Sequence, residues 1–221
     1  MGCGGSSEPD GGRDVRLGGE RPSAVETKRT LVAALGDSIT AGSPLWDPDP
    51  SVREQIGDAL NPESQFEHWA QLRLKGFRFR NCGVFGERTD EIAERLDSCA
   101  KGAEVLVVQG GINDIAQGMP VEGAARNLRA MVERGREKGL RVAIVEVLPW
   151  NNGGARAAGP IRRLNKLIGA IGRDLGVRVY PWYRRLEDPA SAGRMREALT
   201  DDGDHPSVEG YRALAEDVAL P

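Results

Sequence analysis

The stretch TLVAALGDSI, at residues 30–39, decides the fold of this chain. Its first part, residues 31–35, is a short apolar run of the kind found in strands that are buried on both faces of a parallel sheet. Gly36 and Asp37 end the run, so Ser38 falls where the strand stops and a turn begins. Ligands of parallel sheets bind beyond the carboxyl ends of the strands. A serine hydroxyl at this position can face a ligand while the sheet holds its backbone.

Five segments predict the strands of one parallel sheet. They are residues 30–35, 77–82, 104–109, 140–148 and 177–181. Segments with apolar residues spaced three and four apart lie between them and predict helices. Pro120 and Pro160 stand near the expected helix starts, and Gly139 and Gly176 fall where helices should end. This alternation predicts an α/β fold, a three-layer α/β/α sandwich around a five-stranded parallel sheet.

The composition fits one soluble globular domain. The chain has 221 residues, of which 39% are hydrophobic, and a formal net charge of −3. Its 30 basic and 33 acidic residues are interspersed, so we expect no nucleic-acid partner. No apolar run approaches the roughly 18 residues of a membrane span. We expect a monomer.

The first 28 residues differ from the rest and predict a flexible tail ahead of a domain at residues 29–221. They hold seven glycines and almost no large apolar side chain. The start MGCGGSS fits a bacterial lipoprotein just after its lipidated Cys3, with the signal peptide missing, or an N-myristoylated chain, or a tail without function. The excess of 25 arginines over five lysines suggests a GC-rich bacterial genome and favours the lipoprotein. That interpretation predicts a membrane tether and a place in the cell envelope or outside the cell.

The three cysteines form no recognisable framework. Cys3, Cys82 and Cys99 are odd in number and irregular in spacing, which excludes a CxxC zinc pattern. We expect Cys82 and Cys99 to be separate packed thiols. A bridge between them is the alternative if the protein is exported.

A short segment near the C-terminus, DGDHP, supplies a candidate base for Ser38. A serine nucleophile needs a base to take its proton, and a third group must orient that base. Of the two histidines, His68 has no carboxylate at a comparable turn spacing. Asp202, three residues before His205, can fold back onto its ring, whereas the adjacent Asp204 diverges and is expected to be a solvated loop residue. The sequence therefore favours Ser38, His205 and Asp202 as a catalytic group.

Two further segments follow the second and third predicted strands and so reach the same sheet edge. They are NCGVFGERT at residues 81–89 and GGIND at residues 110–114. A glycine there can aim a backbone N–H into the site, and Asn113 can aim its side-chain amide. Acyl transfer needs such donors because negative charge builds on the carbonyl oxygen. Gly83 and Gly86 are both candidates for the glycine donor.

The set GDSI, NxGxxGxxT, GxND and DxxH resembles the SGNH (GDSL-type) hydrolase family, in the right order and over the whole chain after the tail. The resemblance implies the flavodoxin-like SGNH hydrolase fold and a serine esterase that needs no metal or organic cofactor. It implies Ser38 as nucleophile, His205 as base and Asp202 as the carboxylate that orients it. It also implies an oxyanion hole made of the N–H groups of Ser38 and Gly86 and the side chain of Asn113.

The choice between the two glycines and the role of Asp37 follow from their positions. Gly86 is preferred to Gly83 because it directly precedes the polar residue that begins the next helix, as in the family motif. Asp37 is expected to brace the nucleophile turn by hydrogen bonding to backbone rather than to do chemistry.

The substrate is open at this stage. Trp46, in a proline-rich insert after the nucleophile, and Trp150, after the fourth strand, are candidate walls of an acyl pocket, or simply cover the core. Within the class, the alternatives to a carboxylesterase are an O-deacetylase of carbohydrate or cell-wall polymers and a lysophospholipase or thioesterase. Outside the class, a non-catalytic binding module would show a missing motif residue, and none is missing.

Overall fold

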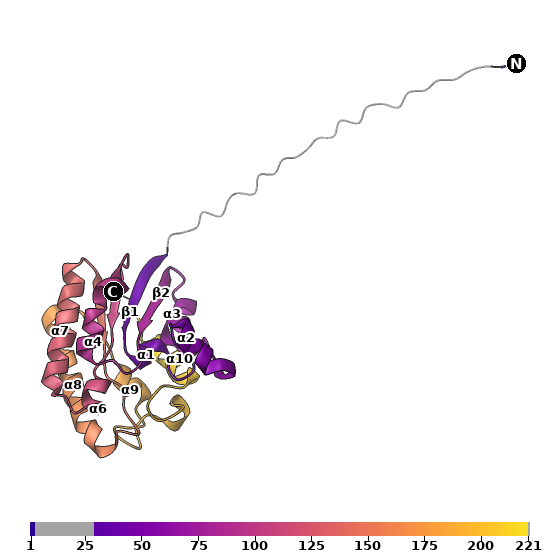
Figure 1. The fold of residues 1–221 in the computed structure, drawn as a ribbon. Helices are drawn as coiled ribbons and strands as arrows, with labels where there is room; N and C mark the ends of the chain where they lie inside the picture. Colours follow the sequence, from indigo (N-terminus) through magenta and orange to yellow (C-terminus); the bar gives the residue numbers. More distant parts are fainter. Residues whose placement is uncertain (3–28, 221) are drawn as a thin grey trace.

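The computed structural model describes residues 1–2 and 29–220, and its centre is a parallel five-stranded sheet (Figure 1). The strand order is β2-β1-β3-β4-β5, which is the flavodoxin-like order. The strands are β1 (Thr30–Gly36), β2 (Phe77–Gly83), β3 (Val105–Val108), β4 (Arg141–Val145) and β5 (Arg178–Tyr180). Because β1 lies between β2 and β3, the ends of these three strands meet around Ser38.

Helices connect the strands and pack on both faces of the sheet. After β1 and before β2 come α1 (Ser38–Ala41), α2 (Pro50–Ile56), η1 (Gly57–Ala59) and α3 (Phe66–Arg73). The helices α4 (Thr89–Glu94), α5 (Leu96–Ala100), α6 (Ile112–Ala116), α7 (Val121–Glu137) and α8 (Gly154–Leu175) follow on either side of β3 and β4. The last are α9 (Trp182–Leu186), η2 (Glu197–Leu199) and α10 (Val208–Glu216).

Each face of the sheet has its own apolar core. One core joins Ala33 and Leu35 of β1 to apolar side chains of α4, α5, α7 and α8. The other joins Val32 and Ala34 to side chains of α1, α3, α9 and α10. Figure 1 shows α4, α7 and α8 on one side of the strands and α3 and α10 on the other. The alternation of inward and outward side chains along a strand thus builds the predicted three-layer sandwich, which is confirmed.

Two predicted boundaries were wrong by three residues or more, whereas the other strand ends differ by at most one residue. β4 ends at Val145, before the expected end at residue 148. The side chain of Asn165 bonds both backbone groups of Val147, so they are not available to a neighbouring strand. It accepts from the N–H at 2.8 Å and donates to the carbonyl at 2.9 Å. Pro160 lies inside α8 rather than near its start, since the helix already begins at Gly154 and Ala157 is buried in the core.

The predicted tail lies almost entirely outside the described residues, and so does Cys3. Among the residues that the structure describes, no helix is long and apolar enough to span a bilayer.

Candidate active site

The candidate nucleophile begins a short helix directly beyond β1. Ser38 is the first residue of α1, and its side chain is largely buried. The carboxylate of Asp37 caps this helix by accepting a hydrogen bond from the backbone N–H of Ile39 at 3.0 Å, as the predicted bracing role requires. Complete burial raises the pKa of Asp37 to about 6, although the hydrogen bond from Ile39 opposes that rise. Asp37 therefore stabilises the nucleophile turn through the hydrogen bond between its carboxylate and the backbone N–H of Ile39.

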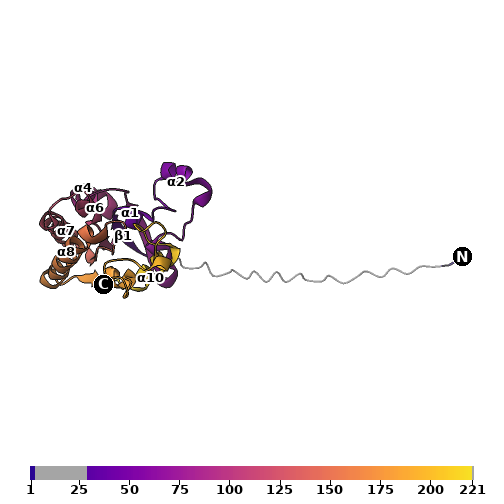
Figure 2. The ribbon, with the colours of Figure 1, turned by 90° about the horizontal axis from the view of Figure 1, so that it is seen from below.

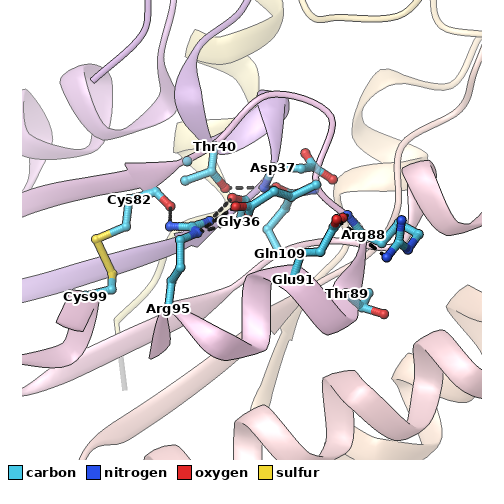
Figure 3. A network of polar contacts seen from close by, with 12 residues as sticks. Gly36, Asp37, Thr40, Cys82, Arg88, Thr89, Glu91, Arg95, Cys99 and Gln109 are labelled. Atoms are coloured by element: carbon cyan, nitrogen blue, oxygen red, sulfur yellow. Dashed lines mark hydrogen bonds and ion pairs between the residues drawn. A yellow bond between two sulfur atoms is a disulfide. The ribbon is translucent and has the colours of Figure 1, made fainter. Parts of the chain in front are cut away.

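Gln109, the residue after β3, locks the same turn from the neighbouring strand. Its Oε1 accepts hydrogen bonds from the N–H of Asp37 at 3.0 Å and from the Thr40 hydroxyl at 2.9 Å (Figure 3). A Cβ on Gly36 would lie 2.2 Å from Thr40 Oγ1 and 2.3 Å from Gln109 Oε1, so only glycine fits there. The sequence reasoning missed Gln109. Its signal was a polar residue at the end of an otherwise apolar strand.

The structure brings Ser38, His205 and Asp202 together. His205 Nε2 lies 3.1 Å from Ser38 Oγ, and His205 Nδ1 lies 2.7 Å from Asp202 Oδ2. His68 lies instead on α3, with its ring centroid 5.2 Å from that of Trp69. The chain of three side chains has the spacing of a nucleophile, a base and an orienting carboxylate.

Asp202 is fixed by the loop in which it stands. Its Oδ1 accepts hydrogen bonds from the backbone N–H groups of Asp204 at 2.8 Å and of His205 at 2.7 Å. Partial burial pulls the pKa of Asp202 upward, but the hydrogen bonds from the His205 ring and from the backbone outweigh it and leave the pKa below its ordinary value. The carboxylate is therefore charged and aimed at the ring at neutral pH.

Asp204 is not the solvated loop residue that the sequence predicted. It is partly buried, and its Oδ1 accepts a hydrogen bond from the indole Nε1 of Trp150. The sequence could not show this, because the loop after β4 and the loop before α10 are 54 residues apart. Trp150 therefore supports the loop that carries Asp202 and His205.

Gly86 and Gly83 have different surroundings. The N–H of Gly83 donates to Asn81 Oδ1 at 2.9 Å, and a Cβ there would lie 2.0 Å from the backbone nitrogen of Ala41. Gly83 thus allows β2 to pack against α1. Gly86 has φ of +81° and open space around it, and no partner among the described residues occupies its N–H. The geometry therefore favours Gly86 as the donor.

Asn113 stands on α6, just after β3, and is tied to the Gly86 turn. Its Nδ2 donates to the carbonyl of Glu87 at 2.9 Å, which leaves the second amide hydrogen available. The next residue, Asp114, is buried and accepts from the backbone N–H of Thr89 at 3.0 Å and from its hydroxyl at 2.7 Å. These bonds fix α6 against the start of α4, and so hold the two candidate donors beside each other.

Arg95 connects the ends of β1 and β2 to the Gly86 turn. Its guanidinium donates to the carbonyls of Cys82 at 2.8 Å and of Gly36 at 3.1 Å (Figure 3). It also forms an ion pair with Glu87 at 2.6 Å. No local sequence pattern predicts this role, because the partners of Arg95 come from β1, β2 and the following turn.

The prediction of separate thiols was wrong, because Cys82 and Cys99 form a disulfide (Figure 3). α5 packs beneath the sheet and brings the two Cα atoms to 6.0 Å, within bonding range, although 17 positions separate them in sequence. The bridge lies one residue before Gly83, at the root of the turn that carries Gly86.

A cavity of about 680 Å³ lies beside this site, and Trp46 is one of its walls. Trp150 is not among the residues that line it. The two tryptophans that the sequence offered as pocket walls therefore lie in different places. Among residues 1–2 and 29–220, no three His, Cys, Asp or Glu side chains gather in a group able to hold a metal ion.

The fold and the polar groups at its strand ends define a doubly wound α/β protein with a site at the carboxyl edge of the sheet. Solved structures with this fold include a member of the lipolytic protein G-D-S-L family from Veillonella parvula, with a TM-score of 0.69 at 19% identity, covering 85% of this chain and 95% of that one. The lipase/acylhydrolase from Enterococcus faecalis has a TM-score of 0.65 at 24% identity and covers 86% and 92%. A GDSL-like lipase from Bacteroides thetaiotaomicron has a TM-score of 0.66 at 21% identity, and the match covers 87% of this chain and 86% of that one.

The chain belongs to the GDSL-like lipase/acylhydrolase family, whose model matches residues 34–213. The match contains the nucleophile turn, the Gly86 turn, Asn113 and the loop of Asp202 and His205. None of the curated proteins compared with the chain matches it. The protein is thus a hydrolase of the GDSL type.

Proposed function

We propose that the protein is a serine esterase that hydrolyses carboxylic esters through an acyl-enzyme. The observation that carries this proposal is the continuous contact from Ser38 Oγ to His205 Nε2 and from His205 Nδ1 to Asp202. The family supports acyl transfer as the class of reaction. A non-catalytic binding module would not need this three-part arrangement.

The proposed reaction has two halves. In the first, Ser38 Oγ attacks the ester carbonyl carbon while His205 takes the hydroxyl proton, and the protonated ring then gives that proton to the departing alcohol. In the second, His205 takes a proton from water, whose oxygen attacks the acyl carbon. The bond from that carbon to Ser38 Oγ then breaks, Oγ takes the proton back from His205, and the acid is released. Asp202 stabilises the imidazolium in both halves.

The oxyanion of each tetrahedral intermediate needs donors that are not already engaged. The N–H groups of Ser38 and Gly86 and the second amide hydrogen of Asn113 meet this condition among the described residues. Their positions are fixed before the substrate arrives: Asp37 and Gln109 hold the turn of Ser38, Arg95 holds the turn of Gly86, and the carbonyl of Glu87 holds Asn113. Such preorganised donors contribute more to the rate than donors that must reorganise.

The test is the loss of one hydroxyl. Ser38→Ala should abolish hydrolysis of p-nitrophenyl acetate with little change in melting temperature, and a fluorophosphonate probe should label Ser38 in the wild type, as shown by peptide mass. Ser191→Ala, in a partly exposed turn, is the control and should keep full activity. Retention of activity within tenfold by Ser38→Ala, or labelling of another residue, would refute the mechanism.

We also propose that the protein works in an oxidising compartment, in the cell envelope or outside the cell. The Cys82–Cys99 disulfide supports this, since disulfides persist mainly in such compartments. Fractionation of the producing cells, with thiol labelling before and after reduction, would test it. Labelling of Cys82 and Cys99 in the native protein before reduction would contradict it.

A further inference from the structure

The segment between α1 and α3 forms an arm whose apolar side chains find no core. Figure 2 shows α2 standing out from the body of the molecule beyond α1. No residue of α2 is buried, and its two large apolar side chains, Val52 and Ile56, are one helical turn apart and partly exposed. Both line the cavity beside the candidate active site, together with Trp46. Apolar groups that face an open cavity instead of a core indicate a place for an apolar ligand.

The arm is held in place by its own contacts. Arg53 Nη1 donates to the carbonyls of Asp47 at 2.7 Å and Pro48 at 2.8 Å, and its guanidinium lies 4.9 Å from the ring centre of Trp46. The first residue of the arm, Ser43, accepts at its carbonyl a hydrogen bond of 3.1 Å from the hydroxyl of Tyr211 on α10. The apolar wall is therefore formed before any ligand binds, which lowers the entropic cost of binding.

The opposite wall comes from the turn between β2 and Gly86. Val84 and Phe85 line the cavity, and they are 39% and 66% exposed. The Phe85 ring centre lies 6.0 Å from that of His205, so one aromatic side chain belongs to the cavity and also borders the candidate base. A group bound between the arm and Phe85 is thus adjacent to a carbonyl carbon placed on Ser38.

The charges around the cavity disfavour an anionic ligand. Its lining contains the carboxylates of Asp47 and Asp49 and a single cation, Arg95. Arg95 is already paired with Glu87 at 2.6 Å. The residues that line the cavity therefore offer no unpaired positive charge to a phosphate or a second carboxylate.

From these observations we infer that the arm and the Val84–Phe85 turn form the binding site for an uncharged apolar substituent of the substrate ester, an aliphatic chain or ring. The inference rests on the proposed esterase function and adds the substrate class to it. The apolar group can belong to the acyl part or to the alcohol part of the ester, and the two parts are separated by experiment.

The experiment measures kcat/KM on two ester series. One series varies the acyl chain from acetate to decanoate on a fixed p-nitrophenyl leaving group, and the other varies the alcohol from ethyl to decyl on a fixed acetyl group. Each methylene that enters the cavity should raise kcat/KM by up to ~4-fold, until the cavity is full. The series that shows the rise identifies the part of the ester that binds there. No rise in either series, with acetate still hydrolysed, would overturn the inference and leave the proposed function standing.

Two kinds of variant connect the rise to this cavity. Val52→Ser and Ile56→Ser should reduce the ratio of kcat/KM between the octyl and the two-carbon substrate of the responsive series by about tenfold or more, since they weaken the apolar wall. Ile56→Trp fills the cavity and should move the optimum to shorter chains. It tests the site without adding a polar group to it.

Leu60→Ser is the matched control. Leu60 lies in the same insert, is 38% exposed and does not line the cavity, so its variant should show the wild-type chain-length profile. An unchanged profile in Ile56→Ser and Ile56→Trp, or the same change in Leu60→Ser, would overturn the inference. Loss of all ester hydrolysis in the wild type would instead contradict the proposed function.

Discussion

At the scale of single residues, Asp202 offers the sharpest test, because two oxygens serve three donors. Oδ1 accepts from the backbone of Asp204 and His205, and Oδ2 accepts from the ring of His205. In Asp202→Asn the amide oxygen can keep the backbone bonds, but the NH₂ then faces Nδ1 and favours the wrong tautomer toward Ser38. We expect kcat on a short ester at pH 8 to fall by ~10²–10⁴ with little change in melting temperature.

Asp204→Asn is the control for that variant. Its amide oxygen can still accept the bond from the indole of Trp150, so the loop keeps its support. We expect kcat to change by less than about threefold, the range of a substitution that spares its contacts. A greater loss for Asp204→Asn than for Asp202→Asn would contradict the assignment of the orienting carboxylate.

The sequence could separate residues whose roles depend on local spacing. Asp202 and His205 are three positions apart, so one turn brings them together, and His68 lacks such a partner. The roles of Gln109 and Arg95 could not be predicted, because they depend on contacts across 72 and 59 positions that only the strand order creates.

At the scale of elements, the junction between α4 and α5 controls the candidate oxyanion hole through Arg95. Arg95→Met removes the ion pair to Glu87, whose carbonyl holds Asn113, and the bonds to the ends of β1 and β2. The donors then lose their fixed positions, which matters most in the transition state. We expect kcat to fall by at least about tenfold. Loss of one donor altogether costs ~10²–10³, which is the upper limit, and KM should be nearly unchanged.

Steady-state kinetics on one short ester, with Arg95→Lys for partial rescue, would measure this effect. Arg80→Met is the matched control, since Arg80 donates to the carbonyls of Cys99 and Lys101 and forms no hydrogen bond or ion pair with the Gly86 turn among the described residues. A change in KM with kcat preserved, or an equal loss in Arg80→Met, would show that Arg95 has only a structural role.

The strands were predictable as elements because their apolar runs are continuous, whereas the arm was not. Residues 43–56 contain three prolines and two aspartates that cap and turn the chain, but the hydrogen-bond partners of these residues lie within the arm itself and leave its apolar side open. Hydrophobic periodicity indicates which face of a helix is buried against a core, and no residue of α2 is buried. A helix that faces a cavity therefore escapes such a pattern.

At the scale of the whole molecule, the core that lies beneath α3 contains a carboxyl group without a partner. Glu67 is buried, and neither of its carboxylate oxygens has a hydrogen-bond partner among the described residues. Burial raises the pKa of Glu67 well above its ordinary value of 4.5. The folded state thus prefers Glu67 to be protonated, while the unfolded state ionises it at an ordinary pH.

This preference sets a sign for the pH dependence of stability. Because the folded pKa of Glu67 is the higher one, its favourable contribution is complete below the unfolded pKa and is lost as the pH rises through the folded pKa. Glu67→Gln cannot ionise, so its free energy of unfolding relative to wild type should increase with pH, by up to about 1.4 kcal/mol per pH unit in that range. Urea unfolding at pH 5, 7 and 9 measures the difference, with the exposed Glu54→Gln as a control that follows the wild type. A difference between Glu67→Gln and wild type that stays constant or shrinks as the pH rises would show that Glu67 is charged in the folded protein.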